Sequence, residues 1–308
     1  MKTYENISVL IQGEPGSFSH EAAETLLPGA QIVPTATAAD LFGHMYNHFN
    51  SLALIPIENS LAGSVLEFYD LLHRDGERLQ IQILRELRLR IRHNLITKPG
   101  ATNRNPENGT CAFPAPFHVY SHPIALMQCR LFLGNHIGLL RPVEFYDTAG
   151  AVKWILEQDN NPYIAAIASK KAAEIYGGEI VLAGIEDNPE NFTRFLLLKF
   201  QNEDNKNERL AEQVLEDVAP PDKMSLILTL KNQPGALAKV LNIFADRQMN
   251  LTKIESRPIQ GRPWEYLFYM DVLFPSAAAA DDAMNCLGPI CERILDLGRY
   301  KAAERPSA

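Results

Sequence analysis

The feature that most constrains the fold is a series of short apolar runs that end at turns rich in glycine or polar residues, with helix-forming segments between them. Such runs occupy residues 7–11, 52–57 and 163–168, and their length and composition are typical of buried strands. Strands that alternate with helices form a mainly parallel sheet, or two lobes that each contain one. The first 200 residues are therefore predicted to be an α/β region, in which ligands bind where strands end.

The first turn comprises residues 13–19, Gly-Glu-Pro-Gly-Ser-Phe-Ser. We predict that a helix follows, with Ser19 as its N-cap. A glycine turn between a strand and a helix directs backbone N–H groups and the positive helix end at an anion. The glycine spacing matches neither the dinucleotide fingerprint nor the Walker loop. A site for a small carboxylate and a plain tight turn both remain open. The inner helix face is predicted to contain Ala22, Ala23, Leu26 and Leu27.

Polar side chains also follow two later strands. Glu58, Asn59 and Ser60 come directly after the run at 52–57, and they offer a carboxylate, an amide and a hydroxyl. Thr193 and Arg194 stand where a polar loop enters the apolar run at 196–198. An arginine there suits a carboxylate, because its guanidinium donates two parallel hydrogen bonds. The alternatives are structural: a helix cap at residues 59–60, and a strand-end threonine beside a surface ion pair.

Three other polar residues lie in the α/β region. Ser121 is predicted to cap a helix with Pro123 in its first turn, and Gln128 lies about two turns further on. His93 falls within residues 81–96, which alternate well enough for one long strand or a bent pair. A lone histidine on a strand is more often a packing residue than a catalytic base, so we expect packing there.

The last third of the chain has a different pattern. Residues 201–222 are charged and end in two prolines, which indicates a linker between domains. Beyond it we predict a βαββαβ unit, which is the ferredoxin-like order. The turn at 232–235 precedes the first helix of this unit, and residues 255–258 end the neighbouring strand. A small ligand could place its carboxylate on the helix end and its amine on Glu255.

Composition excludes several classes of protein. The net charge of -8 over 308 residues argues against a nucleic-acid binder. The arginines at positions 85, 88, 90 and 92 alternate with apolar residues, so we place them on the solvent side of a strand. The four cysteines include no CxxC pair, which favours free thiols and no metal site. No run approaches a membrane span and the start resembles no signal peptide, so we expect a cytoplasmic protein.

Taken together, these motifs resemble the prephenate dehydratase family. The resemblance rests on five motifs in order: residues 13–19, Ile-Pro-Ile-Glu-Asn-Ser at 55–60, Ser-His-Pro at 121–123, Gln-Cys at 128–129 and Asn-Phe-Thr-Arg-Phe at 191–195. Residues 232–237 and 255–258 resemble the amino-acid-binding motifs of the family's regulatory ACT domain. Ile124 and Glu14 depart from the common pattern, where glutamine and proline are frequent.

The resemblance implies conversion of prephenate to phenylpyruvate, water and carbon dioxide, in phenylalanine synthesis and without a cofactor. It implies an α/β catalytic region at 1–200 with two lobes like those of periplasmic binding proteins, a linker at 201–222 and an ACT domain at 223–308. The same motifs are compatible with arogenate as substrate, and with an amino-acid sensor that has lost catalysis. An intact Thr193-Arg194 pair favours the enzyme.

The resemblance also implies site residues. The predicted catalytic residues are Thr193, Arg194, Asn59, Ser121 and Gln128, and we expect Thr193 to donate a hydrogen bond to the leaving hydroxyl, with Glu58 as an alternative acid. The predicted substrate-binding residues are Gly16, Ser17, Phe18, Glu58, Ser60 and Phe195. Phenylalanine is the expected effector, bound where the ACT domains of a homodimer or homotetramer meet. Its predicted contacts are Asn232, Gly235, Ala236, Leu237, Glu255 and Ser256.

Overall fold

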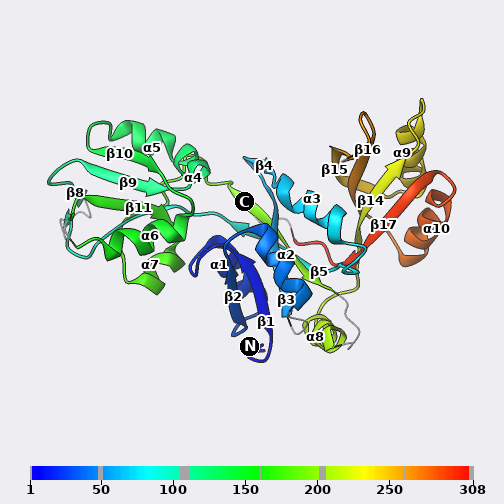
Figure 1. Ribbon diagram of the computed structural model, residues 1–308, viewed down its shortest axis with the longest axis horizontal. Coiled ribbons are helices and arrows are strands. Elements are labelled where there is room, and N and C mark those ends of the chain that lie inside the picture. Colours follow the sequence, from blue (N-terminus) through cyan, green and yellow to red (C-terminus); the bar gives the residue numbers. More distant parts are fainter. Residues whose placement is uncertain are drawn as a thin grey trace. The chain divides into compact units, whose positions relative to one another are not determined.

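In the computed structural model of the chain, the apolar runs form strands of three larger sheets (Figure 1). Helices connect many of the successive strands. The structure describes residues 2–47, 51–104, 111–159, 161–200, 206–259 and 261–304. Among the described residues, none of the helices combines the length and the apolar character that crossing a bilayer demands.

The first sheet has the strand order β2-β1-β3-β13-β5, with the short strand β4 paired to β3. β1 and β2 are parallel, and β3 and β4 are antiparallel. The apolar runs explain the central strands, because most residues of β3 and the last six of β13 are buried. The strands are β1 (Ser8–Gln12), β2 (Gln31–Thr35), β3 (Ser51–Asn59), β4 (Gly63–Ser64), β5 (Gln82–Arg90) and β13 (Phe192–Lys199). The helices between them are α1 (Phe18–Leu26), α2 (Ala38–Asn47) and α3 (Leu66–Asp75).

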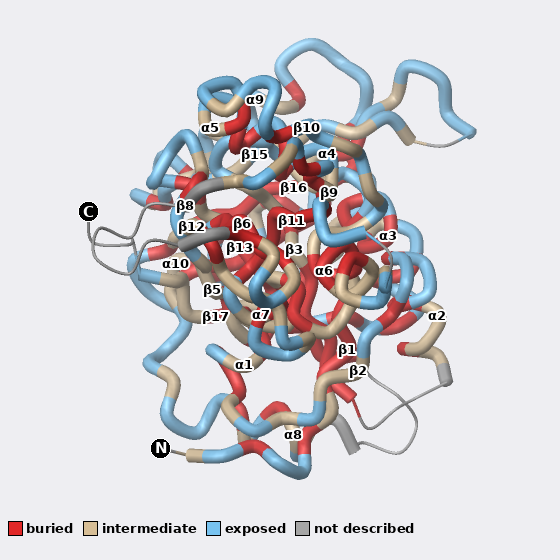
Figure 2. The backbone as a smooth tube through the Cα atoms, turned by 90° about the vertical axis from the view of Figure 1, so that its left-hand side faces the viewer, coloured by how far each residue is buried: buried red, intermediate tan, exposed pale blue. Residues whose placement is uncertain are grey.

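The second sheet has the order β10-β9-β11-β6-β12. β9 is parallel to β10 and β11, whereas β6 is antiparallel to β11 and β12. Every residue of β11 is buried, which explains its continuous apolar sequence (Figure 2). The strands are β6 (Asn94–Thr97), β9 (Phe117–Ser121), β10 (Leu140–Glu144), β11 (Ile164–Ala168) and β12 (Glu179–Ala183). The helices are α4 (Pro123–Gln128), α5 (Arg130–Asn135), α6 (Thr148–Glu157) and α7 (Lys170–Tyr176).

The third sheet confirms the predicted βαββαβ unit. Its elements are β14 (Lys223–Leu230), α9 (Ala236–Asp246), β15 (Asn250–Pro258), β16 (Tyr266–Leu273), α10 (Ala277–Leu287) and β17 (Cys291–Tyr300). The strand order is β15-β16-β14-β17, and every neighbouring pair in it is antiparallel. One face of α9 is apolar: Val240 and Phe244 are buried in the core of this unit, and Leu237 and Leu241 pack against it.

The longer strands β2, β9, β10 and β12 were not predicted from the sequence, and neither were the two-residue strands β4, β7 (Asn103–Arg104) and β8 (Cys111–Ala112). β9 lies inside its sheet, whereas β2, β10 and β12 each lie at an edge, where only part of the strand is buried. Pro34 and Pro142 also interrupt two of them, and proline is tolerated on edge strands because it lacks a ladder N–H. The sequence signal of an edge strand is therefore weak.

Two segments, residues 81–96 and the predicted linker at 201–222, are more complex than the simplest interpretation of the sequence. Residues 81–96 form β5 and β6, which belong to different sheets, so the bent pair is correct and the single strand is wrong. The segment expected to be a linker contains the helix α8 (Lys206–Leu215), in which Ala211 and Val214 are buried. Its residues 201–205 lie outside the described residues. The short strands β7 and β8 pair with each other between β6 and β9.

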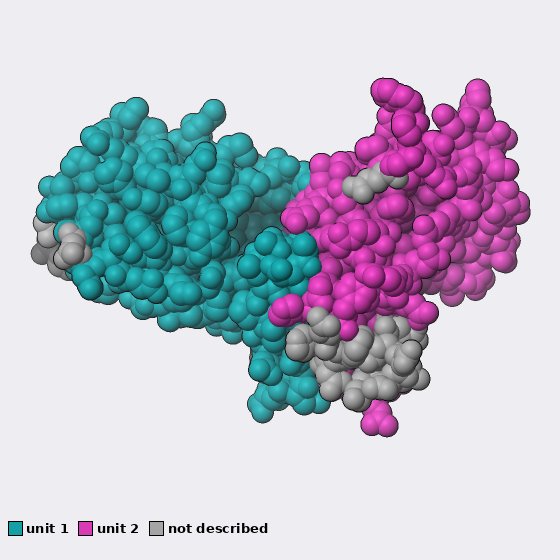
Figure 3. All heavy atoms as spheres, in the orientation of Figure 1, with its two compact units in different colours: residues 1–41, 58–64, 89–195 teal, residues 42–57, 65–88, 196–308 magenta. Residues whose placement is uncertain are grey.

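The chain forms two compact units, each assembled from three segments (Figure 3). The first contains residues 1–41, 58–64 and 89–195, and the second contains residues 42–57, 65–88 and 196–308. All the predicted catalytic residues lie in the first unit, so their geometry can be described within it. The domain boundaries at 200 and 223 stay predictions.

Candidate active site

Asn59, the last residue of β3, joins two distant parts of the chain. Its side-chain Oδ1 accepts hydrogen bonds from the backbone N–H groups of Leu61 at 3.0 Å and Ala62 at 2.9 Å. Its Nδ2 donates to Asn191 Oδ1 at 2.8 Å and lies 3.0 Å from Thr193 Oγ1. Asn59 therefore does not cap a helix. It holds the turn after β3 against the start of β13.

Ser60 strengthens the same junction. Its Oγ donates to the backbone carbonyl of Glu190 at 3.0 Å and accepts from the N–H of Phe192 at 3.0 Å. The backbone N–H of Ser60 also donates to the carbonyl of Phe192 at 2.8 Å. These bonds close the loop before β13, so the hydroxyl of Ser60 is already used within the protein.

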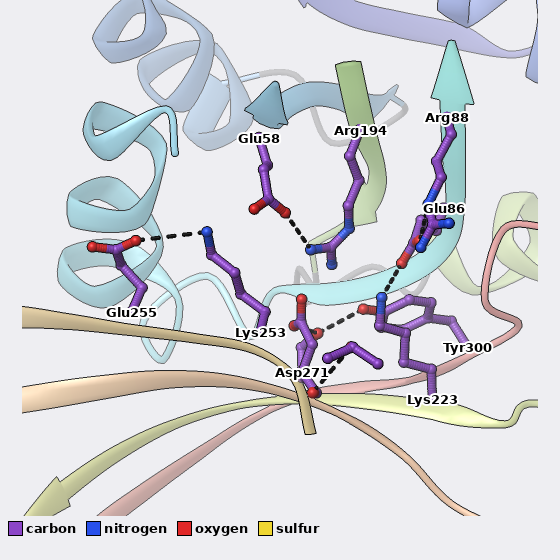
Figure 4. Close-up of polar contacts among 11 residues, drawn as sticks. Glu58, Glu86, Arg88, Arg194, Lys223, Lys253, Glu255, Asp271 and Tyr300 are labelled. Atoms are coloured by element: carbon purple, nitrogen blue, oxygen red, sulfur yellow. Dashed lines mark hydrogen bonds and ion pairs between the residues drawn. The ribbon is translucent and has the colours of Figure 1, made fainter. Parts of the chain in front are cut away.

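Thr193 and Arg194 are the second and third residues of β13, as expected for residues where a loop enters a strand. Thr193 is half-buried. The Arg194 side chain is only 8% exposed, and its guanidinium lies 3.5 Å from a carboxylate oxygen of Glu58 (Figure 4). Phe195 is almost completely buried, so contact with a substrate would require that its ring be uncovered.

Gln128 and His93 extend the polar cluster away from Thr193. Gln128 Nε2 lies 3.4 Å from Asn59 Oδ1, and Gln128 Oε1 lies 2.8 Å from His93 Nε2. Both residues are buried. Burial lowers the pKa of His93, against smaller opposing effects of the Gln128 contact and the Glu186 carboxylate. The histidine is therefore neutral at neutral pH. Its ring faces Gln128, which makes it more than the packing residue expected from the sequence.

Ser121 does not cap the helix after it, which corrects the prediction. It is the last residue of β9, it is fully buried, and its Oγ donates to the carbonyl of Ile167 on β11 at 2.6 Å. The cap of α4 is His122, whose Nδ1 accepts from the N–H of Ile124. Ile124 itself is 43% exposed, so the departure from the family pattern at this position leaves the core unchanged.

The first glycine turn is fixed to the start of α7. Ser169 caps α7, and its hydroxyl donates to the carbonyl of Gly16 at 2.5 Å. Ser17, and not Ser19, caps α1: its Oγ accepts from the N–H of His20, and Ser19 lies within the helix and is buried. Ala22, Ala23, Leu26 and Leu27 are buried, as expected.

The turn also contacts the polar cluster through Phe18. Its ring meets the imidazole of His93 edge-on, with 5.4 Å between centroids. Glu14 lies 3.4 Å from Lys153 in a partly exposed ion pair, so the missing proline at this position is replaced by a charge contact.

Sequence reasoning did not assign roles to Asn191 or Asp147. Asn191 is fully buried and accepts from Asn59. The carboxylate of Asp147 caps α6, accepting from the N–H of Gly150 at 2.6 Å, and burial raises the pKa of this carboxyl group. The sequence contained a signal for Asn191, since this residue begins the Asn-Phe-Thr-Arg-Phe motif. Aspartate is a common N-cap residue, so the cap at Asp147 could have been predicted, but nothing in the sequence connected it with the candidate site.

Comparison with known proteins decides the family. The family model described as prephenate dehydratase matches residues 9–203, and the ACT domain model matches residues 224–280. "Arogenate dehydratase/prephenate dehydratase 2, chloroplastic" of Arabidopsis thaliana is 37% identical over 290 residues, which cover 91% of this chain and 68% of the relative. The chain belongs to the prephenate dehydratase family.

Solved structures agree with this assignment. A prephenate dehydratase from Arthrobacter aurescens in complex with L-Phe has a TM-score of 0.78 and 27% identity, over 98% of this chain and 92% of that one. A protein described as GqqA, a novel type of quorum quenching acylase, has a TM-score of 0.76 and 29% identity, over 96% and 98%. The family has a mixed α/β catalytic region and a C-terminal ACT domain, and its members are dehydratases of aromatic amino-acid synthesis.

The predicted effector residues of this dehydratase lie in the ACT sheet. Gly235 precedes α9 in a left-handed conformation, with φ +79, and no side chain caps the helix. The register of β14, β16 and β15 places the turn at 231–235 and the end of β15 at the same end of the sheet. Ala236 is buried, Leu237 is half-buried and Asn232 is exposed. On β15, Ser256 is exposed and the Glu255 carboxylate lies 3.6 Å from Lys253 Nζ (Figure 4).

Proposed function

We propose that this dehydratase converts prephenate to phenylpyruvate, with Thr193 as the group that assists departure of the hydroxyl. The observation that carries the proposal is the contact between Asn59 Nδ2 and Thr193 Oγ1 at 3.0 Å, beside the guanidinium of Arg194. In this reaction the bond to the ring carboxylate breaks, its electron pair makes the ring aromatic, and the ring hydroxyl leaves. One proton is taken up, and the products are carbon dioxide, water and phenylpyruvate.

The hydroxyl of Thr193 is suited to stabilise the leaving oxygen. It accepts a hydrogen bond from an amide, and this polarises its O–H bond as a donor. Threonine is a weak acid, so its contribution is a hydrogen bond to the developing hydroxide more than a complete proton transfer. Aromatisation supplies much of the driving force, so a strong acid is not required. Glu58 is the alternative proton donor on this surface.

Arg194 provides the charge that a dianionic substrate needs. A guanidinium forms two parallel hydrogen bonds with a carboxylate, and this pairing is stronger when the side chain is buried from water. Because Glu58 lies 3.5 Å away, binding of a substrate carboxylate would share or replace that ion pair. We infer that Glu58 then moves away from Arg194 or takes up a proton.

Arogenate is the alternative substrate, because the related Arabidopsis protein carries both activities in its name. Arogenate differs from prephenate by an ammonium group in place of the keto oxygen. A protein carboxylate close to this ammonium group would favour arogenate over prephenate, and Glu58 is a candidate for that contact. The two substrates should therefore be compared directly.

We also propose that phenylalanine regulates the enzyme through the ACT domain of a homodimer or homotetramer. Support comes from the related Arthrobacter structure, which is a complex with L-Phe. The proposed contacts are Asn232, Gly235, Ala236, Leu237, Glu255 and Ser256.

The test is product formation by the purified protein from prephenate and from arogenate, with and without phenylalanine. Thr193→Val should lower kcat about 10²–10³-fold, which is the usual effect of removing one such donor. Thr193→Ser keeps the hydroxyl and should retain most of the activity. Near-normal turnover by Thr193→Val would contradict the role of Thr193.

Two other functions give different results in the same experiment. An amino-acid sensor would bind phenylalanine and turn over neither substrate. An acylase, as described for GqqA, needs a hydroxyl with a base beside it, whereas the contact of Thr193 is an amide nitrogen that cannot accept a proton. The geometry thus favours hydrogen-bond donation over nucleophilic attack.

A further inference from the structure

We propose that His93 is a positioning residue: its Nε2–H holds the Gln128 amide in the orientation that Asn59 requires, in a hydrogen-bond chain from His93 through Gln128 and Asn59 that leaves the Thr193 hydroxyl proton free to point at the substrate. The proposal rests on the function proposed above, because it explains how Thr193 acts as a donor. It is argued from the three contacts that join His93, Gln128, Asn59 and Thr193.

The direction of the chain is set at the backbone of Leu61 and Ala62. Both N–H groups point at the same side-chain atom of Asn59, at 3.0 and 2.9 Å. A backbone N–H can only donate. The atom that receives them must be the amide oxygen, so the orientation of the Asn59 amide is determined by its neighbours and cannot be reversed.

The amide nitrogen of Asn59 therefore faces Thr193. Its acceptors are Asn191 Oδ1 at 2.8 Å, the Phe192 carbonyl at 3.2 Å and Thr193 Oγ1 at 3.0 Å. An amide nitrogen has no lone pair with which to accept a proton. Thr193 can only accept from it, so the hydroxyl proton of Thr193 points elsewhere.

The orientation of Gln128 follows from that of Asn59. The 3.4 Å contact to Asn59 Oδ1 requires the Gln128 nitrogen, because two amide oxygens would repel each other. The Gln128 oxygen is then the atom that lies 2.8 Å from His93 Nε2. An oxygen accepts, and His93 Nε2 must therefore carry a proton.

The surroundings of His93 select a neutral ring in this tautomer. Its Nδ1 is buried and has no hydrogen-bond partner within the described part of the chain, so a proton there would be buried without an acceptor. The Glu186 carboxylate contacts the backbone N–H of His93 at 2.9 Å, and Phe18 presents its ring edge-on to the imidazole.

Loss of the His93 N–H donor would remove the hydrogen bond that holds the Gln128 amide, at the end of the hydrogen-bond chain away from Thr193. The Gln128 amide could then rotate and turn its oxygen toward Asn59 Oδ1, which would disturb the Asn59–Thr193 contact. The Arg194 guanidinium, which is proposed to bind a substrate carboxylate, is not a member of this hydrogen-bond chain. The effect should therefore appear in kcat more than in KM.

The experiment compares His93→Phe, which keeps a planar ring but has no donor, with His93→Gln, which restores an N–H donor on a side chain of similar reach. We expect His93→Phe to lower kcat about 10-fold or more with KM within about 3-fold, and His93→Gln to recover most of kcat. His118→Gln, at an exposed position of β9, is the control for replacing a histidine. Equal loss in His93→Phe and His93→Gln, or unchanged kcat in His93→Phe, would overturn the proposal.

A second measurement does not depend on activity or on the stability of a variant. NMR of the wild-type chain labelled with ¹⁵N-histidine reports which ring nitrogen of His93 is protonated near neutral pH. A proton on Nε2 alone is expected, whereas a proton on Nδ1 or a charged ring would overturn the proposal. If the wild type turns over neither substrate, the proposed function fails, and the tautomer still shows whether the hydrogen-bond chain exists.

Discussion

Gly16 shows how tightly a single position of the site is built. Its φ of +88 lies in the left-handed region, and a Cβ there would be 2.7 Å from the Cα of Ala172. The carbonyl of Gly16 accepts the hydroxyl of Ser169 at 2.5 Å. The turn therefore approaches α7 more closely than any other residue type would allow.

Gly16→Ala should destabilise the protein by about 2–4 kcal/mol, because it combines backbone strain with a backbone clash. Gly63→Ala is a matched control: its φ is +85, but nothing lies within 4 Å of the added Cβ. The control should lose about 1–2 kcal/mol. Urea denaturation of both variants measures the difference, and equal losses would show that the approach to Ala172 has no energetic consequence.

His93 should also make stability depend on pH. Burial lowers its pKa in the folded chain below the ordinary value of 6.5, so between these two pKa values the unfolded chain binds more protons. Stability is then complete above about pH 6.5 and falls as the pH is lowered toward the folded-state pKa, by up to about 1.4 kcal/mol per pH unit.

His20 and His73 have pKa values lowered by burial as well and add to the same slope. The contribution of His93 is therefore the difference between the wild type and His93→Phe. We expect denaturation curves from about pH 5 to 8 to show a shallower loss of stability in the variant. Parallel curves would mean that the imidazole titrates alike in both states.

At the scale of elements, α3 contacts the ACT strands. Arg257 on β15 forms a bidentate ion pair with Asp70 on α3, at 2.9 and 2.7 Å. The ring of Tyr269 on β16 meets that of Tyr69 edge-on, with 4.7 Å between centroids, and its hydroxyl donates to the Tyr69 carbonyl. Arg257 directly follows the proposed effector residues Glu255 and Ser256, so it can connect them with α3.

Arg257→Ala should weaken the response to phenylalanine and leave the basal activity within about 2-fold. The physical reason is that an effector shifts activity only through contacts that differ between two states, and typical couplings of this kind correspond to about 5–150-fold. Arg262→Ala is the control, because its ion pairs with Glu265 and with Glu292 on β17 join residues of the same ACT unit and do not involve α3. Activity measured against phenylalanine concentration checks this. An unchanged response in Arg257→Ala would exclude this route.

At the scale of the whole molecule, a buried ion pair joins β5 to the ACT sheet. Lys223 Nζ lies 2.7 Å from Glu86, and the two side chains are 2% and 0% exposed (Figure 4). Beside them, Ser225 contacts Asp271 at 2.5 Å and the Tyr300 hydroxyl at 2.7 Å. Arg88 Nε lies 3.7 Å from the other oxygen of Glu86, at a longer distance and with a more exposed side chain. Removing Lys223 therefore leaves a buried carboxylate that has lost its short, buried ion pair.

Lys223→Met should destabilise the protein by about 3–5 kcal/mol, and adding Glu86→Leu should recover much of that loss. Lys301→Met is the control, since its ion pair with Asp222 joins side chains that are 40% and 35% exposed, and it should cost about 1 kcal/mol or less. Thermal and denaturant unfolding compare the three variants with the wild type. No recovery in the double variant would show that the loss comes from packing and not from the charge.

Much of this architecture is local and could be predicted. Most central strands and most helices follow from apolar spacing, and the candidate polar residues follow from their positions next to strands. The cap predicted at Ser121 and the cap alternative at Asn59 are wrong, because tertiary contacts use those side chains for Ile167 and Thr193 instead. The edge strands were not predicted because a partly buried strand has only a weak pattern of apolar residues.

The sequence by itself determined the family and much of the order of elements, and it led to the residues proposed for the chemistry, because these depend on residue type and short spacing. Only the tertiary structure decided which polar groups meet. Asn59 and Thr193 are 134 residues apart, and Glu86 and Lys223 are 137 apart. Glu86 shares an alternating segment with arginines that we placed toward solvent, yet it is buried, because a counter-ion from a distant strand makes burial of its charge tolerable.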